Sequence, residues 1–309
     1  MHNFNMFDWN DLRYFLAVAR ENSTLAAAKA LRVNQSTVQR RLTTLETQLG
    51  CALIERHPTG CRLTEIGEQL LPHAEIVEQA ASSLQRHLAS FDKGLRGIIR
   101  LTCSTAVAHR LMHSGVLDVF HTRYPGLTVE LLMTERFLDL SKGQADVAIR
   151  GGEPGDQSLV GRRIANVPWA IYASRSYVAR RGSPKNAEDM ESHSIIEFIG
   201  EIADLKAARW LRSKAPGAII SGQSSNVPSV LLAVKSGIGI APLPAPLADP
   251  DDQLLRVLGP IQELSYPTYL LAHRDLRKIP RISAFFEFCV SELGPVLTGS
   301  ERGKKSAKV

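Results

Sequence analysis

The segment VNQSTVQRRLTTLE, residues 33–46, combines an apolar stripe with side chains that hydrogen-bond well to nucleic acid. Val38, Leu42 and Leu45 recur at helical spacing, so one face of the predicted helix is apolar. The other face carries hydroxyl, amide and guanidinium groups, which bind base edges and phosphates. The residues of this face that we expect at DNA are Gln35, Ser36, Thr37, Gln39, Arg40 and Arg41. A polar helix face is equally common on ordinary protein surfaces, so the flanking elements must decide between the two interpretations.

The flanking residues predict a helix-turn-helix followed by a hairpin. Residues 8–31 fit two helices, for which Asp8 and Ser23 are suitable N-caps, and Asn34 is a favoured N-cap for the polar-faced helix. Residues 51–63 lose the helical period around a turn-rich centre, which indicates a small hairpin. A helix-turn-helix with such a hairpin is a winged helix, and its second helix enters the major groove.

Each polar group of this winged helix suits a different part of DNA. Arg40 and Arg41 suit guanine edges or phosphates, whereas the amides of Gln35 and Gln39 suit adenine. Contacts to the phosphate backbone fix the register of a protein on DNA without reading sequence. Three further DNA contacts are predicted at the helix start and the hairpin: Ser23, Arg56 and Arg62.

A long helix follows, with Thr64 as its N-cap and an end near Phe91. Its apolar residues are spaced alternately by four and three, which is a heptad seam and predicts pairing with a partner helix. The alternative is that this helix packs only on its own domain, because three heptads is a minimal signal. The seam residues that we expect at a dimer interface are Leu70, Val77, Leu84, Leu88 and Phe91.

From Gly97 the chain changes to short, often β-branched apolar runs that alternate with helical stretches, and a last helix follows Pro280. This alternation predicts an α/β fold whose parallel sheets are covered by helices on both faces. The expected strands are 98–103, 127–133, 146–150, 169–173, 194–198, 217–221 and 268–272, and the helices between them include 107–122, 203–213 and 226–236.

Composition sets the broad class. The 309 residues are 44% apolar and 22% charged, as in ordinary globular proteins, and the net charge of +6 permits a polyanionic partner. No signal peptide is recognisable and no apolar run approaches the roughly 20 residues that span a bilayer, so we expect a cytoplasmic protein without membrane contact. The four cysteines, at 51, 61, 103 and 289, fit no zinc pattern and are expected as unpaired thiols.

Enzyme motifs are absent from the sequence. It contains no G-x-S-x-G elbow, P-loop, H-E-x-x-H or dinucleotide fingerprint, so no catalytic residue, metal site or cofactor is predicted. We therefore expect a binding protein rather than an enzyme.

Residues 11–71 resemble the LysR-type transcriptional regulators. The C-terminal segments ADVAIRGG (145–152), WAIYASRSYVARRGSP (169–184), VKSGIGIAPLP (234–244) and PRISAFFEF (280–288) are also similar to family signatures. The matching positions in the N-terminal segment are Ala27-Ala28, Leu31, Gln35, Val38, Leu45-Glu46, Leu49-Gly50, Leu53, Arg56, Leu63-Thr64 and Gly67. The resemblance departs at Arg32, which stands where glycine, asparagine or histidine is common, so a left-handed backbone there costs about 1 kcal/mol.

The resemblance implies an α/β protein with an all-α winged helix-turn-helix N-terminal domain and a two-lobed effector domain like the periplasmic binding proteins. Its partners are then double-stranded promoter DNA, a small-molecule effector, RNA polymerase, and further copies of the chain in a dimer or tetramer. A carboxylate is one candidate for the effector. The implied divisions are a DNA-binding domain at 6–64, a dimerisation helix at 65–92, an effector domain at 97–294 and a disordered basic tail at 295–309. The first lobe takes 97–151 and 272–294, and the second takes 165–268.

The resemblance also places an effector cleft between the two lobes. Hydroxyl groups beside a helix N-terminus suit an anionic ligand. Ser104 and Asn226 are equally well explained as helix N-caps. The residues that match the family's cleft are Ser104, Thr105, Thr134, Gly151, Ser224, Ser225 and Asn226.

Two functions from different classes fit these features. The first is a sequence-specific DNA-binding transcriptional regulator whose activity a small effector modulates. The alternative is an α/β solute-binding module or enzyme whose N-terminal helices only mediate assembly. The winged-helix segment distinguishes the two.

Overall fold

The computed structural model describes residues 7–57, 60–89 and 95–300, and only the backbone at 56, 83 and 85–89. The chain forms two compact units, Met1–Gln85 and Arg86–Val309. Within the described part, no helix is both long and apolar enough to cross a membrane.

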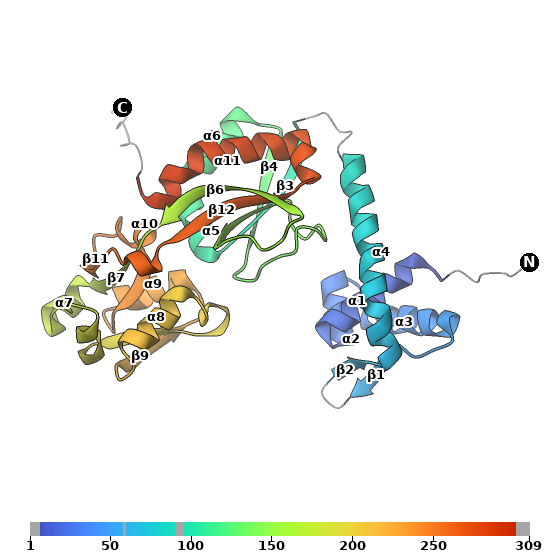
Figure 1. Ribbon diagram of the computed structural model, residues 1–309, viewed down its shortest axis with the longest axis horizontal. Helices are drawn as coiled ribbons and strands as arrows, with labels where there is room; N and C mark the ends of the chain where they lie inside the picture. Colours follow the sequence, from blue (N-terminus) through green and yellow to red (C-terminus); the bar gives the residue numbers. More distant parts are fainter. Residues whose placement is uncertain (1–6, 58–59, 90–94, 301–309) are drawn as a thin grey trace, which may run out of the picture. The chain divides into compact units, whose positions relative to one another are not determined.

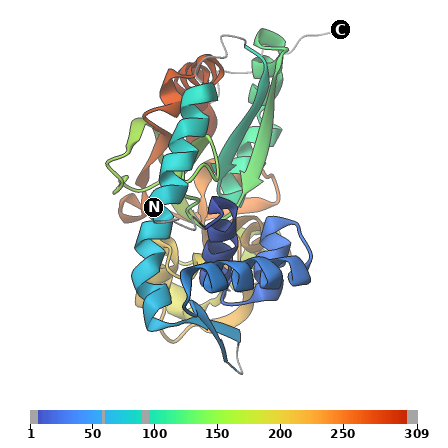
Figure 2. The same cartoon turned by 90° about the vertical axis from the view of Figure 1, so that its right-hand side faces the viewer.

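The first unit is a winged helix-turn-helix. Figure 2 shows its helices beside the start of α4, with the hairpin of β1 and β2 projecting from them. The hairpin strands pair antiparallel, Ile54 with Leu63 and His57 with Gly60. The elements are α1 (Trp9–Glu21), α2 (Thr24–Leu31), α3 (Gln35–Leu49), β1 (Ile54–His57), β2 (Gly60–Leu63) and α4 (Glu65–Ala89).

Local caps and turns explain where these helices begin and end. The side chains of Asp8 and Ser23 accept hydrogen bonds from Asn10 N–H and Ala26 N–H, and Thr64 Oγ1 accepts one from Gly67 N–H, so all three predicted N-caps are confirmed. Asn34 occupies the N-cap position of α3, but its side chain makes no capping hydrogen bond. Arg32 adopts a left-handed conformation with φ of 56°, although it carries a full side chain.

The core of the first unit fastens the hairpin to the helices. Leu12, Phe15 and Leu45 are buried together with Leu53, which precedes β1. Glu46 on α3 reaches across, because its Oε1 accepts hydrogen bonds from Leu53 N–H at 2.8 Å and Ile54 N–H at 3.1 Å. On the other strand, Cys61 N–H donates to the carbonyl of Asn22 in the turn after α1.

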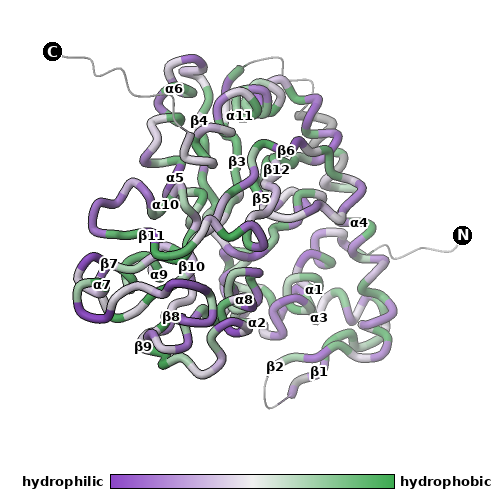
Figure 3. Tube along the Cα trace, turned by 60° about the vertical axis from the view of Figure 1, so that its left-hand side comes forward, coloured by the Kyte–Doolittle hydropathy of each residue, from purple (hydrophilic) through white to green (hydrophobic). Residues whose placement is uncertain are grey.

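The second unit contains two lobes (Figure 1). The first lobe has a five-stranded sheet in the order β4-β3-β5-β12-β6, and α11 packs along β6. The β3–β4 and β3–β5 pairs are parallel, whereas β12 runs antiparallel to both β5 and β6. The central strands are mostly hydrophobic (Figure 3). The elements of this lobe are β3 (Gly97–Cys103), α5 (Thr105–His113), α6 (Val116–Arg123), β4 (Leu127–Met133), β5 (Val147–Gly151), β6 (Leu159–Val167), β12 (Tyr266–His273), η4 (Leu276–Lys278) and α11 (Pro280–Thr298).

The second lobe is built on two smaller sheets. One has the order β10-β7-β11 with antiparallel pairs, and the other is the parallel pair β8–β9. An isolated bridge from Ile195 to Ile240 joins them. The elements are β7 (Trp169–Ser174), α7 (Arg175–Arg181), η1 (Glu188–Ser192), β8 (Ser194–Phe198), η2 (Gly200–Ile202), α8 (Lys206–Lys214), β9 (Ile219–Ser224), α9 (Val227–Lys235), β10 (Ala241–Pro244), α10 (Ala245–Ala248), β11 (Leu254–Leu258) and η3 (Gln262–Leu264).

The lobe boundaries differ from those predicted. The first lobe keeps β6 and all of β12, so the chain leaves it after Val167 and returns at Tyr266, rather than near 151 and 272. The expectation of parallel sheets is met only in part. The first sheet is mixed, because β12 runs antiparallel to β5 and β6, and the β10-β7-β11 sheet is antiparallel throughout, whereas β8–β9 is parallel. Strand β6 was not predicted, because its exposed Gly161-Arg162-Arg163 run lies on a sheet edge and lacks the apolar pattern of a buried strand.

Two helices also differ from the prediction. The helix expected at 107–122 is two helices, because Gly115 adopts a left-handed conformation with φ of 73° and separates α5 from α6. The last helix continues to Thr298, although the basic tail was predicted to begin at 295. The buried side chains of Val296 and Leu297 hold this last turn in the core, and the rest of the predicted tail from 301 lies outside the described residues.

Glu46 provides a test of how the hairpin is held. Glu46→Ala removes the acceptor of two hydrogen bonds, so we expect it to lower the free energy of unfolding by about 1–3 kcal/mol. Urea unfolding followed by circular dichroism measures the change, with the exposed Gln48→Ala as the control. Equal midpoints for the two variants would show that the hairpin does not depend on this carboxylate.

Candidate nucleic-acid interface and ligand cavity

The polar face of α3 is exposed where it was predicted to contact DNA. The side chains of Ser36, Gln39 and Arg40 are exposed, and Val38 behind them is fully buried. Among the described residues, the Arg40 guanidinium has no hydrogen-bond or ion-pair partner. This arrangement leaves Arg40 available to a ligand while Val38 fixes the orientation of the helix.

Some predicted DNA contacts are engaged within the unit. Gln35 donates its side-chain N–H to Thr24 Oγ1 at 2.9 Å, which joins the start of α3 to α2. Ser23 caps α2, so its hydroxyl oxygen already accepts a hydrogen bond. Thr37 is half-buried on α3.

Arg41 is bound to carboxylates of its own unit. Its guanidinium lies 3.2 Å from Asp11 Oδ1 and 3.6 Å from Asp8 Oδ2. The Asp11 side chain is fully buried on α1, and a buried carboxylate without a cation is costly. The sequence placed Arg41 with Arg40 on the DNA-facing side, but the geometry gives Arg41 the structural task of neutralising Asp11.

Of the two hairpin arginines, only Arg62 has a described side chain. Arg62 is exposed on β2 and lies opposite Glu55. The backbone of Arg56 in β1 pairs with that of Cys61 in β2, and the Arg56 side chain lies outside the described residues.

The predicted seam of α4 divides into two parts. Leu70 packs against the core of the first unit and Ala74 is buried, which agrees with the alternative that this helix packs on its own domain. Farther along, Val77 is 41% exposed and Leu84 is 60% exposed, so these apolar side chains lack cover. The side chain of Leu88 and all of Phe91 lie outside the described residues.

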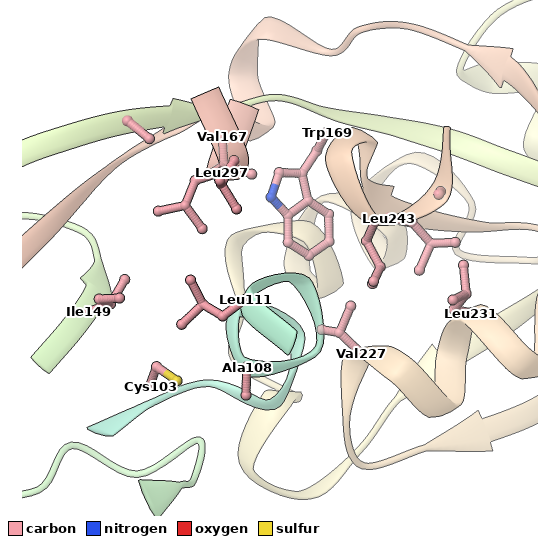
Figure 4. Packing of buried hydrophobic residues seen from close by; sticks show 14 of the residues in the cluster. Cys103, Ala108, Leu111, Ile149, Val167, Trp169, Val227, Leu231, Leu243 and Leu297 are labelled. Atoms are coloured by element: carbon pink, nitrogen blue, oxygen red, sulfur yellow. The ribbon is translucent and has the colours of Figure 1, made fainter. Parts of the chain in front are cut away.

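A cavity of about 500 Å³ lies between the two lobes of the second unit. Both lobes supply its walls: Cys103, Val107, Ile149, Val167 and Leu297 come from the first lobe, and Trp169, Leu205, Val227, Pro244 and Leu247 from the second. Figure 4 shows the Trp169 ring among Leu111, Leu297, Val227 and Leu243, which belong to four different elements. The volume lies in the range of small-molecule binding sites.

The seven predicted effector residues are only partly brought together. Ser104, Thr134 and Gly151 line the cavity, whereas Thr105, Ser224, Ser225 and Asn226 do not. Ser104 and Asn226 act as N-caps of α5 and α9, accepting hydrogen bonds from Val107 N–H and Ser229 N–H. For these two residues the capping interpretation describes the observed contacts.

Sequence reasoning missed the charged side chains of the cavity. Glu135 and Arg136 directly follow the predicted Thr134, so the end of β4 carried a usable signal. Arg110, Lys206 and Arg209 lie on helices, where apolar periodicity does not show which charges face a ligand. The charged lining residues are Arg110, Glu135, Arg136, Arg150, Asp204, Lys206 and Arg209.

Three charged contacts define the lining near the end of β4. Arg136 Nε donates to Glu201 Oε1 at 2.5 Å, and this pair joins the first lobe to η2 of the second. Burial lowers the pKa of Arg150, whose guanidinium donates to the Leu138 carbonyl and lies 4.7 Å from the centre of the Phe137 ring.

Glu135 holds the first residue of α5. Its Oε1 accepts hydrogen bonds from Thr105 N–H at 3.0 Å and Thr105 Oγ1 at 2.6 Å. Burial, with a smaller contribution from the Glu135 charge, raises the pKa of the Cys103 thiol to about 12. All four cysteines are free, as expected from their spacing.

Known protein families match both units of this chain. A family described as "LysR substrate binding domain" matches residues 92–294, and one described as "Bacterial regulatory helix-turn-helix protein, lysR family" matches residues 9–68. An HTH-type transcriptional regulator of Xanthomonas campestris is 30% identical over 60% of this chain and 54% of its own length. The regulator CrgA of Neisseria meningitidis serogroup C is 27% identical over 94% of this chain and 98% of its own.

A solved structure agrees on the fold. The full-length Vibrio cholerae virulence activator AphB, described as a member of the LTTR family, superposes with a TM-score of 0.61 at 24% identity, covering 92% of this chain and 99% of its own. The winged helix and the cavity between two lobes are the features of a DNA-binding protein that responds to a ligand. This chain belongs to the LysR family of bacterial transcriptional regulators, and the interpretation as a regulator rather than an enzyme is confirmed.

The different environments of Arg40 and Arg41 lead to a prediction. Arg41→Ala leaves the buried Asp11 carboxylate without its close cation, so we expect a loss of about 3 kcal/mol in the free energy of unfolding. Arg40→Ala removes an exposed side chain and should change stability by less than about 0.5 kcal/mol. Thermal unfolding of the two variants measures the contrast, and similar midpoints would show that the Arg41–Asp11 pair contributes little.

Proposed function

We propose that this regulator reads its operator with the exposed face of α3, as a homo-oligomer, and that a small anionic effector between its lobes changes that binding. The observation that carries the proposal is the charge of the cavity. Its lining has five cationic side chains, Arg110, Arg136, Arg150, Lys206 and Arg209, against two carboxylates, Glu135 and Asp204. A surplus of positive charge at a small cavity favours anionic ligands.

The effector class follows from the balance of charge and apolar surface. Trp169, Val107 and Leu297 offer apolar walls, so the ligand should carry an apolar body as well as a negative group. Arginine binds carboxylates with two parallel hydrogen bonds, which supports a carboxylate as that group. Such a ligand regulates only if it binds two lobe arrangements with unequal affinity.

The DNA-binding half of the proposal rests on exposed polar groups. Ser36, Gln39 and Arg40 present donors and acceptors on α3, and Arg62 presents a cation on the hairpin. Contact with RNA polymerase and action in the cytoplasm, where promoter DNA lies, belong to the same proposal.

Operator binding with and without ligand tests the whole proposal. The full chain is titrated onto its own promoter DNA in the presence of small carboxylates with apolar bodies, each matched by its uncharged amide. We expect at least one carboxylate to change the affinity and its amide to leave it unchanged. Amides as active as the carboxylates would contradict an anionic effector, and failure to retain promoter DNA would contradict the assignment of α3.

Arg40 gives a sharper prediction for DNA reading. Arg40→Ala should weaken operator binding by about 1–3 kcal/mol and relax the preference at one base pair, because a base contact discriminates between sequences. Mobility-shift titrations on the operator and on single-base variants measure both effects. An equal loss on specific and random DNA would reassign Arg40 to a phosphate.

The exposed seam of α4 predicts dimerisation. Leu84→Asp should abolish the dimer and operator binding with it, because a carboxylate buried in an apolar interface is costly. Gln79→Asp, on a different face of α4, is the matched control. Sedimentation velocity gives the oligomeric state, and an intact dimer for Leu84→Asp would remove the seam from the interface.

A further inference from the structure

Three helices begin at the wall of the cavity, and their N-terminal amides differ in what they bind. Residues of the first turns of α5, α8 and α9 all line the cavity. The first amides of a helix have no acceptor inside the helix and carry partial positive charge, so a free N-terminus binds anions. Which of these ends is free therefore bears on where the effector's charge can lie.

The N-terminus of α5 is already occupied by the protein itself. Ser104 Oγ accepts from Val107 N–H, and the Glu135 carboxylate accepts from both the N–H and the hydroxyl of Thr105. A second carboxylate at the same amides would have to displace Glu135 or lie beside it against charge repulsion. This end, where the sequence placed the effector, is closed to an anion.

The N-terminus of α9 is capped by a side chain. Asn226 Oδ1 accepts a hydrogen bond from Ser229 N–H at 2.9 Å. The first turn, Val227-Pro228-Ser229, contains no cationic side chain, and proline lacks an N–H. An anion finds little to bind there.

The N-terminus of α8 is different. Its N-cap is the apolar Leu205, which offers no side-chain acceptor, and the N–H groups of Lys206 and Ala207 have no acceptor among the described residues. The exposed cations of Lys206 and Arg209 line the cavity one helical turn apart and have no ion-pair partner in the described part of the chain. Asp204 just before the helix offsets one of these charges.

A separate observation concerns a buried hydroxyl group in the same cavity that lacks a hydrogen-bond partner. Thr268 on β12 is only 2% exposed and lines the cavity, and its hydroxyl oxygen has no hydrogen-bond partner among the described residues. Buried hydroxyl groups are nearly always hydrogen-bonded in folded proteins. A bound ligand with a polar group in the cavity would supply the missing partner.

We propose that the effector's anionic group binds at the N-terminus of α8, between Lys206 and Arg209, and that Glu135 excludes it from the N-terminus of α5. The proposal rests on the proposed anionic effector and names the site that holds its charge. The apolar body then lies along the Trp169 side of the cavity, and a second polar group reaches Thr268. The ligand class is an apolar monoanion, a carboxylate first of all, with a hydrogen-bonding group away from its charge.

Calorimetric titration of the full chain tests the position of the charge. The probes are 4-isopropylbenzoate and the uncharged 4-isopropylbenzamide. We expect Lys206→Gln and Arg209→Gln each to weaken benzoate binding about three- to tenfold while leaving the amide unchanged. Lys214→Gln, at the far end of α8 and outside the cavity, is the matched control and should change neither affinity. Thr105→Val should also leave the benzoate affinity unchanged.

A second measurement decides the question if neither probe binds. Crystals of the full chain grown in sodium bromide should show an anomalous bromide peak at the amides of Lys206 and Ala207 and none at Thr105. The Glu135→Ala variant should gain a second bromide at Thr105, because the resident carboxylate is gone.

Several outcomes would overturn the inference. These are loss of benzoate binding in Thr105→Val with the α8 variants unaffected, benzoate binding no tighter than the amide, or bromide at Thr105 of the wild-type chain with none at α8. Benzoate binding that depends on Thr105 would leave the anionic effector standing and remove only its position at α8. Loss of promoter binding, measured separately, would bear on the regulator and not on this site.

Discussion

The antiparallel pairing of β12 with β5 and β6 is the constraint on which the effector unit depends. The chain leaves the first lobe after Val167 and returns at Tyr266, and these two residues are paired in register. Both connections between the lobes therefore start from one patch of sheet. Gly151 lies at this patch, and a Cβ there would collide with the Tyr266 ring, so glycine is required for close packing.

The same patch positions the cavity. Thr268 and Gly151 are register partners on β12 and β5, and Trp169 follows the crossing with its ring centre 6.2 Å from that of Tyr266. Because the two crossing segments are adjacent, the lobes share one hydrophobic cluster that includes Val167, Trp169 and Leu243. The two lobes are therefore held together by apolar packing beside the cavity.

Local signals made much of the fold predictable, and long-range pairing made the rest unpredictable. Asp8, Ser23 and Thr64 identified helix starts because a cap is a contact over two or three residues, and the winged helix followed from their order. Strand β6 was missed because an edge strand with Gly161, Arg162 and Arg163 lacks the apolar run that marks a buried strand. Strand β10, APLP, was missed because its two prolines argue against a strand, although it pairs at the edge of its sheet.

The candidate sites show the same division. Exposure of Arg40 followed from helical periodicity, but the pairing of Arg41 with Asp11 joins α3 to α1 across thirty residues and has no local signature. In the cavity, family likeness pointed to hydroxyl groups near α5, and the actual contacts there depend on Glu135, which comes from another strand's end. Sequence position can suggest which groups approach a ligand, but not which of them the protein has already used.

The loop after β4 joins the cavity's chemistry to the arrangement of the lobes. Glu135 holds α5 in the first lobe, and its neighbour Arg136 holds Glu201 in the second. An exposed ion pair such as Arg136–Glu201 contributes at most about 1 kcal/mol, so it biases a lobe arrangement without locking it. Arg136 also lines the cavity, so this contact between the lobes is part of the cavity wall. A weak pair across the lobes in the wall of the cavity lets small differences in contact between two lobe arrangements decide which of them a ligand binds more tightly.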